Sequence, residues 1–95
     1  MKISYDASKR NKTLLERGLD FQDSHLVFFS EHPVISVLDD RTDYGEERWQ
    51  TMGMLHDDLV MIVWTPRAEA RRIISMRKCN DREKGYYHVT VDRSG

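Results

Sequence analysis

The stretch that decides the fold is Leu59-Val60-Met61-Ile62-Val63-Trp64-Thr65, which is apolar on both faces of an extended chain. A strand with one solvated face alternates apolar and polar side chains, whereas a strand buried on both faces is a continuous apolar run. The run is far shorter than the roughly 20 apolar residues that a membrane-spanning helix needs. We therefore expect residues 59–65 to form the central strand of a sheet.

Further extended segments flank this strand and are joined to it by short polar connections. We expect strands at residues 34–38 and 48–55 before it and at residues 70–77 after it, with a polar turn over residues 39–45. Regular alternation in the last strand places Arg77 on one face of the sheet and Arg72 on the other. Short polar turns between successive strands favour an antiparallel meander.

The amino-terminal part has the pattern of an edge strand followed by two helices. Residues 3–5 are expected to form the strand, and Asp6 is a good N-cap for a helix that Gly18 would end. Asp20 is placed to cap a second helix, which the His32-Pro33 pair would stop. The helices would cover one face of the sheet, so the fold class is α+β. Residues 81–87 are expected to form a last helical turn, and residues 88–95 have no assigned structure.

Length and composition limit the chain to one domain, residues 1–95, because a chain of 95 residues holds a single core. With 39% hydrophobic and 33% charged residues it has the composition of neither a disordered tail nor a membrane protein. The amino terminus turns polar before an apolar signal segment could form. Cys79 is the single cysteine, which fits a reducing compartment, so a cytoplasmic location is expected.

The net charge of −1 conceals an uneven distribution of charge along the chain. Acidic residues outnumber basic ones between residues 16 and 58, whereas basic residues outnumber acidic ones between residues 67 and 84. Lys9, Arg10 and Lys12 form a second basic group. This asymmetry favours a bipolar surface with a basic region that attracts a polyanion. The alternative is an ordinary solvated surface.

The sequence lacks the residue patterns of several common kinds of functional site. The four histidines, at positions 25, 32, 56 and 88, do not have the close spacing of a zinc site. Gly45 and Gly53 stand alone, so there is no glycine-rich phosphate loop. Ser75 has no adjacent base that would make it a nucleophile. No metal or cofactor is therefore expected.

The arginines in and beside the strands are the better candidates for chemistry. Cleavage of RNA without a metal requires a base for the 2′-hydroxyl, cations for the phosphate charge and a proton for the leaving oxygen. Arginine suits the phosphate role because its guanidinium donates two hydrogen bonds at once. The alternative is that these arginines pair with the many Asp and Glu side chains.

Blocks of sequence in the same order resemble the BrnT family of toxins, from about residue 3 to residue 87. The blocks are Tyr5-Asp6-Ala7-Ser8-Lys9, Gly18-Leu19-Asp20-Phe21, Val27-Phe28-Phe29, Asp40-Arg41, Tyr44-Gly45-Glu46-Glu47-Arg48-Trp49, Thr65-Pro66-Arg67 and Arg72-Ile73-Ile74-Ser75-Met76-Arg77-Lys78. The resemblance implies a RelE-like fold, with helices packed on an antiparallel sheet whose open face binds RNA. It also implies a metal-independent ribonuclease toxin that inhibits translation, acts on free or ribosome-associated RNA and is neutralised by a BrnA-like antitoxin. That partner binds operator DNA, so the toxin would reach DNA only through it.

The resemblance also implies the site residues. Arg48, Arg67 and Arg77 are the candidates for gripping the scissile phosphate, and Glu47 is the candidate general base. The expected RNA-binding residues are Lys9, Arg17 and Arg72.

One departure supports an alternative function. Many members of the family have Lys-His-Gly where this chain has Glu16-Arg17-Gly18. A guanidinium stays charged at working pH and cannot accept a proton, so Arg17 cannot replace a catalytic histidine. The alternative is a non-catalytic binding module that pairs with a DNA-binding antitoxin in repression of the operon.

Overall fold

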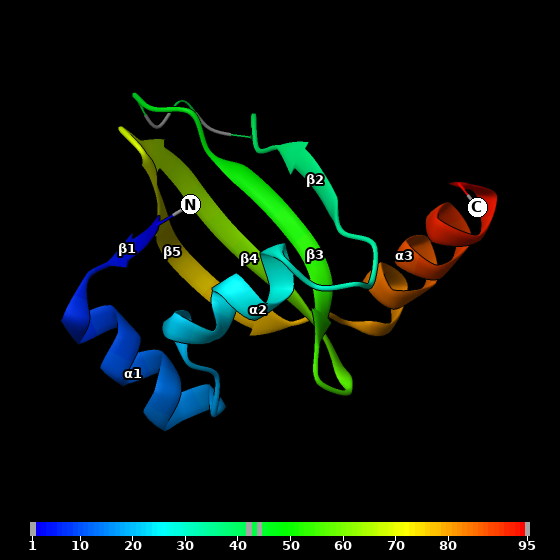
Figure 1. Ribbon diagram of the computed structural model, residues 1–95, viewed down its shortest axis with the longest axis horizontal. Coiled ribbons are helices and arrows are strands. Elements are labelled where there is room, and N and C mark those ends of the chain that lie inside the picture. The colour runs from blue at the N-terminus through cyan, green and yellow to red at the C-terminus, as the bar shows by residue number, and fades with distance from the viewer. Residues whose placement is uncertain (1, 42, 44, 95) are drawn as a thin grey trace.

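One five-stranded sheet organises the molecule in the computed structural model, which describes residues 2–41, 43 and 45–94 (Figure 1). The strands are β1 (Lys2–Tyr5), β2 (Ile35–Leu38), β3 (Trp49–Leu55), β4 (Asp58–Arg67) and β5 (Ala70–Lys78), in the spatial order β1-β5-β4-β3-β2. The apolar run predicted as the central strand is indeed the middle strand, β4. The turn expected over residues 39–45 includes residues 42 and 44, which lie outside the described residues.

The sheet is mixed, which corrects the prediction of an antiparallel sheet. The pairs β2–β3, β3–β4 and β4–β5 are antiparallel, but β1 pairs with β5 in parallel. A parallel pair needs a long connection between its strands, and residues 6–69 lie between β1 and β5. Local turn signals predict hairpins, but this pairing joins segments about 70 positions apart and leaves no local signal.

A β-bulge in β5 changes which arginines share a face. Ser75 pairs with Val63 and Ile73 pairs with Trp64, so Ile74 is an extra residue in β5. Beyond the bulge, Arg72 pairs with Thr65, whereas Arg77 pairs with Met61. Because Thr65 and Met61 are four residues apart on regular β4, Arg72 and Arg77 lie on the same face. The prediction that they lie on opposite faces was wrong, because it assumed unbroken alternation.

The first amino-terminal helix begins where its capping residue predicts, whereas the predicted second cap starts a 3₁₀ turn. Helix α1 (Ala7–Arg17) is capped by Asp6, which accepts a hydrogen bond of 3.0 Å from the Lys9 N–H. It ends at Gly18, whose φ of 69° is the left-handed conformation that glycine adopts freely. Asp20 caps the 3₁₀ turn η1 (Phe21–Asp23), which leads into the short helix α2 (Ser24–Phe28). The second helix therefore ends well before the predicted His32-Pro33 stop.

The carboxyl-terminal segment forms a full helix, α3 (Asp81–Ser94), where a single turn was predicted. Val89, Thr90 and Val91 favour extended structure by themselves, but tertiary packing overrides this preference. The helix packs Tyr87 against a cluster that includes Met52 and Met61. The Tyr87 hydroxyl also donates a hydrogen bond of 2.6 Å to the Pro33 carbonyl.

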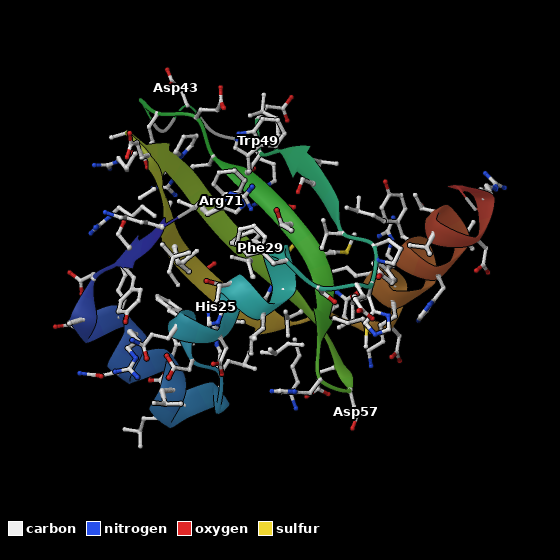
Figure 2. The ribbon with its side chains drawn as sticks, viewed as in Figure 1. His25, Phe29, Asp43, Trp49, Asp57 and Arg71 are labelled. Carbon is white, nitrogen blue, oxygen red and sulfur yellow. The ribbon has the colours of Figure 1, made fainter. Side chains whose placement is uncertain are left out.

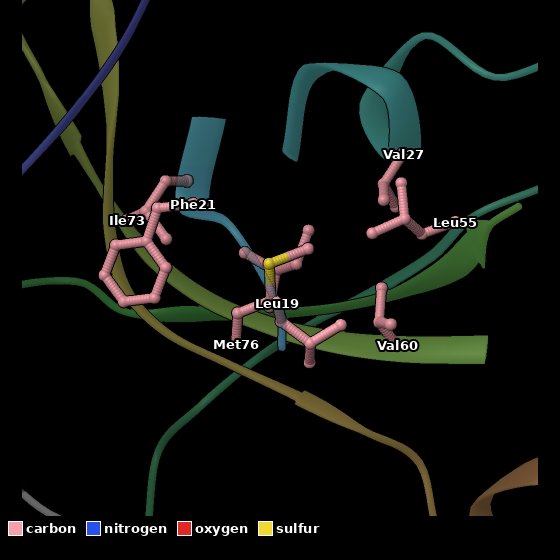
Figure 3. Close-up of a cluster of buried hydrophobic side chains, with 8 residues drawn as sticks. Leu19, Phe21, Val27, Leu55, Val60, Ile73 and Met76 are labelled. Carbon is pink, nitrogen blue, oxygen red and sulfur yellow. The ribbon is translucent and has the colours of Figure 1, made fainter. Parts of the chain in front are cut away.

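Two hydrophobic clusters lie on opposite faces of the sheet. The larger cluster joins Leu19, η1 and α2 to the face that carries Ile62, Ile73 and Met76 (Figure 3). We call this the helical face. The opposite face carries Met61, which packs against α3, and also Arg67, Arg72, Ser75 and Arg77; we call it the arginine face.

Close contact between α2 and β3 fixes the helix on the helical face. A Cβ added at Gly53 would lie 2.6 Å from Val27 Cγ1 and 2.9 Å from Val34 Cγ1. Both distances are below van der Waals contact, and valine side chains have little freedom to move aside. Only glycine allows the backbone of β3 to approach α2 this closely.

Candidate nucleic-acid interface

The β4–β5 hairpin presents a row of polar and basic side chains on the arginine face. Every second residue of β4 points to this face, so Arg67 lies beside Thr65, the partner of Arg72. Ser75 and Arg77 continue the row along β5. Residues predicted separately as catalytic and as RNA-binding therefore share one surface.

Glu46 holds two of these arginines at one end of the sheet. Arg48 Nε lies 3.2 Å from Glu46 Oε2, and Arg67 Nη2 lies 3.0 Å from Glu46 Oε1. The hydrogen bond from Arg48 is the main cause that lowers the pKa of Glu46 below its ordinary value. The structure thus brings Arg48 and Arg67 together around a carboxylate that the sequence analysis did not select. The spacing Glu46-x-Arg48 was the available signal, because alternate residues of an extended chain lie on the same side.

Glu47, the predicted general base, has a different neighbour. Its Oε1 accepts a hydrogen bond of 2.7 Å from Trp49 Nε1, and the Trp49 ring stacks on Trp64. Within the described part of the chain, this carboxylate contacts the indole and no arginine. The Glu47 carbonyl, however, accepts a hydrogen bond of 2.5 Å from Thr65 Oγ1, so its backbone lies next to the strand position that pairs with Arg72.

Arg77 lies at the other end of the arginine face. Its register partner, Met61, is six residues from Arg67 along β4, which corresponds to about 20 Å. Its Nη1 and Nη2 each donate a hydrogen bond of 2.8 Å to the Glu83 carboxylate. This pairing lowers the pKa of Glu83 to about 2. Arg77 is therefore not part of the Glu46 cluster.

A cleft of about 460 Å³ opens beside Arg77, between β2, β3 and β4 and the start of α3. Its walls are largely apolar, with Met52 and Met61 at the sheet, and Gln50, Arg82 and Tyr86 add polar groups. The α3 residues of this cleft lie within the predicted helical segment 81–87, but none of them was predicted as a site residue. The pattern Asn80-x-x-Glu83 was a usable signal, since it matches a helix-capping box.

The two basic residues predicted on α1 lie at the open edge of β5. β1 covers β5 only up to Ile73, and beyond it Lys9 and Arg17 line a groove of about 220 Å³ together with Ser75. Arg17 Nη1 donates a hydrogen bond of 2.9 Å to the Met76 carbonyl, which fixes α1 against the strand. Because Ser75 belongs to the arginine face, the basic residues of α1 extend that face around the sheet edge.

Comparison with known families identifies the family of this chain. The model of the family described as the ribonuclease toxin BrnT of type II toxin–antitoxin systems matches residues 5–83. The chain belongs to this family. A search of curated proteins gives no match. The BrnT match spans every predicted site residue from Lys9 to Arg77, and it ends within the first turn of α3.

The described residues contain neither a metal-binding cluster nor a membrane-spanning helix. Across residues 2–41, 43 and 45–94, no His, Cys, Asp and Glu side chains form a group of three or more that could hold a metal ion. In the same part of the chain, no helix has the length and apolar character to cross a membrane.

Proposed function

We propose that this BrnT-family toxin is a metal-independent endoribonuclease that binds RNA across its arginine face. The observation that carries the proposal is the bulge at Ile74, because it places Arg72 on the same face as Arg67 and Arg77. Cleavage of cellular RNA by this face inhibits translation, and a BrnA-like antitoxin neutralises the toxin. Operator DNA is reached through that antitoxin.

The reaction is attack by a ribose 2′-oxygen on the adjacent phosphorus. A new bond between phosphorus and the 2′-oxygen forms while the bond to the 5′-oxygen of the next nucleotide breaks, which leaves a 2′,3′-cyclic phosphate. The 2′-hydroxyl loses its proton to a base, and the leaving 5′-oxygen gains a proton. Guanidinium groups stabilise the additional negative charge on the phosphate oxygens as it develops.

Roles for the residues follow from their positions. Arg48, Arg67 and Arg72 contact the scissile phosphate, with Glu46 orienting the first two. Glu47 accepts the 2′-hydroxyl proton. Its backbone adjoins Thr65, and its exposed side chain must leave the Trp49 indole to reach a substrate bound on the arginine face.

The residues at the far end and the edge of the face hold the RNA strand. Arg77 lies about 20 Å from the Glu46 cluster, so it contacts a different phosphate of the same strand. Lys9 and Arg17 contact the backbone where the strand passes the edge of β5. A surface of this length binds several nucleotides.

The test is cleavage of labelled RNA by the purified chain in EDTA, with and without ribosomes. We expect the wild type to leave 2′,3′-cyclic phosphate ends, and Arg72→Ala and Arg77→Ala to be slower, Arg72→Ala by about 10²-fold or more. Arg93→Ala is the matched control, because Arg93 lies in the last turn of α3, which projects away from the sheet (Figure 1). Intact RNA in every wild-type reaction would reject the proposal.

A second candidate function is a non-catalytic binding module that supports repression of the operon. The pairing of Arg48 and Arg67 with Glu46, and of Arg77 with Glu83, favours it, because paired arginines are typical of structural networks. In that case Arg77→Ala would leave the cellular effect of the toxin unchanged, whereas a variant that loses the antitoxin would abolish repression.

A further inference from the structure

Arg71 differs from the other strand arginines in its surroundings, because its guanidinium group packs against two aromatic rings and has no acidic partner within the described residues. It lies on the helical face, where its guanidinium carbon is 4.2 Å from the centre of the Phe28 ring and 4.7 Å from that of the Trp64 ring. Its Nε is buried and has no hydrogen-bond partner there. Burial lowers the pKa of the Arg71 guanidinium.

This environment leaves part of the charge of Arg71 uncompensated. A guanidinium keeps its proton at working pH, so it cannot relieve the cost of burial by becoming neutral. The aromatic faces offset some of that cost. A stacked guanidinium still has N–H groups along its edge, and these require an acceptor in the plane of the group. An approaching carboxylate or phosphate would supply it.

The surface around Arg71 is apolar and aromatic. Figure 2 shows Arg71 between Trp49 and Phe29 over the helical face. Phe29 is 65% exposed, and Leu38, which pairs with Trp49 across β2 and β3, is 49% exposed. We call this surface the aromatic patch; it comprises Phe28, Phe29, Leu38, Trp49, Trp64 and Arg71.

The composition of the aromatic patch fits a protein partner better than RNA. Aromatic residues and arginine are the types that dominate the buried centres of protein–protein interfaces. RNA affinity depends on several cations that contact phosphates, and this patch offers only Arg71. The arginines that we assign to RNA lie on the opposite face of the sheet.

We propose that the aromatic patch is the docking surface for the antitoxin, and that an antitoxin carboxylate flanked by apolar side chains pairs with Arg71. The partner itself follows from membership of a type II toxin–antitoxin family, and the ribonuclease face enters only as the opposite surface. Trp49 follows Arg48 directly, so an antitoxin seated here reaches the same end of the sheet as the Glu46 cluster, on the opposite face.

Arg71 and Arg72 are adjacent in the sequence but lie on opposite faces of the sheet, so matched substitutions of the two test the proposal. Arg71→Met and Arg72→Met each remove one charge from adjacent residues and keep an apolar side chain in its place. The affinity for a purified BrnA-like antitoxin is measured by calorimetry, and RNA cleavage is measured in parallel. We expect Arg71→Met to weaken antitoxin binding by about 30-fold or more and to leave cleavage unchanged. Arg72→Met should slow RNA cleavage and leave antitoxin binding unchanged.

A substitution of the exposed Phe29 tests the same surface even if Arg71→Met fails to fold. Phe29→Ser replaces a largely exposed side chain, and we expect about 10-fold weaker antitoxin binding with an unchanged unfolding temperature. Wild-type antitoxin affinity in both Phe29→Ser and folded Arg71→Met would overturn the inference. Loss of cleavage by Arg71→Met with intact antitoxin binding would assign the patch to RNA and also overturn it. Failure of the wild type to cleave RNA would count against the proposed ribonuclease alone, since the binding arm is independent.

Discussion

The arginines of this molecule differ in their exposure to solvent and in the carboxylates that hold them. Arg67 is 56% exposed, so its pair with Glu46 is screened by solvent and contributes little to folding stability. The same pair holds Arg67 and Arg48 in a fixed orientation, which is useful to a site that must grip a phosphate. At this scale the carboxylates are best understood as groups that position the arginines.

Glu46 and Glu47 have different contacts, so substitutions at the two positions distinguish a general base from a residue that positions arginines. We predict that Glu47→Gln lowers kcat for RNA cleavage by about 10²- to 10⁴-fold with little change in KM, because it removes the proton acceptor. Glu46→Gln should chiefly raise KM, because it releases Arg48 and Arg67. Steady-state kinetics on a short RNA measures both. A large loss of kcat in Glu46→Gln with none in Glu47→Gln would move the base to Glu46.

At the scale of elements, Glu83 joins β5 to α3. Its side chain accepts a hydrogen bond of 2.9 Å from the Asn80 N–H, and its own N–H donates one of 2.9 Å to Asn80 Oδ1, which is a reciprocal capping box. The same carboxylate receives both hydrogen bonds from Arg77. One residue therefore starts the helix and ties it to the end of the strand.

The charge of Glu83 predicts a dependence of stability on pH. Arg77 holds the pKa of Glu83 at about 2 in the folded chain, against an ordinary value of 4.5. Because the folded pKa is the lower one, the stabilisation is complete above about pH 4.5 and is lost as the pH falls through 2. We expect Glu83→Gln to lower the free energy of unfolding by about 1–2 kcal/mol at pH 7 and by almost nothing at pH 2.

Chemical denaturation at the two pH values measures this difference, and Asp81→Asn is the control. Asp81 is fully exposed, and its Oδ1 lies as far as 3.9 Å from Lys84 Nζ. The loss of this weak ion pair should change stability little at either pH. An equal destabilisation by Glu83→Gln at both pH values would show that the capping box, and not the charge, is responsible.

Sequence patterns predicted most elements but not their irregularities. Alternation and apolar runs located β2 to β5, and Asp6 and Gly18 fixed the ends of α1, because these signals are local. The length of α3 was not predictable in the same way, since its β-branched residues favour extended structure until Tyr87 is packed against the sheet. The bulge at Ile74 likewise arises from the pairing of β5 with β4.

At the scale of the whole molecule, the sheet separates two kinds of surface. The arginine face and the basic groove of α1 lie on one side and edge, and the aromatic patch lies on the other side. The net charge is only −1, which gives little long-range attraction for RNA, so the proposed RNA binding would depend on local phosphate contacts. If both proposals hold, these opposite faces present separate surfaces to RNA and to the antitoxin.

Local phosphate contacts predict a clear response to salt. The logarithm of RNA affinity should fall linearly with the logarithm of salt concentration, with a slope of about −0.7 for each phosphate neutralised on single-stranded RNA. Arg72→Ala should make the slope shallower by about 0.7, because it removes one contact. Arg71→Met, on the other face, should leave it unchanged. Fluorescence anisotropy with a labelled RNA measures the slopes, and equal slopes in wild type and Arg72→Ala would contradict the assignment.

The sequence by itself determined the α+β class, the central strand and the family, because apolar periodicity, capping residues and ordered motifs are written along the chain. It also selected Arg48, Arg67 and Arg77, although not their grouping. Only the tertiary structure decided that β1 pairs in parallel with β5, that Arg72 shares a face with Arg77, and that Glu46 holds Arg48 and Arg67. The physical reason is that register and side-chain partners depend on contacts between distant segments, which exist only once the sheet has formed.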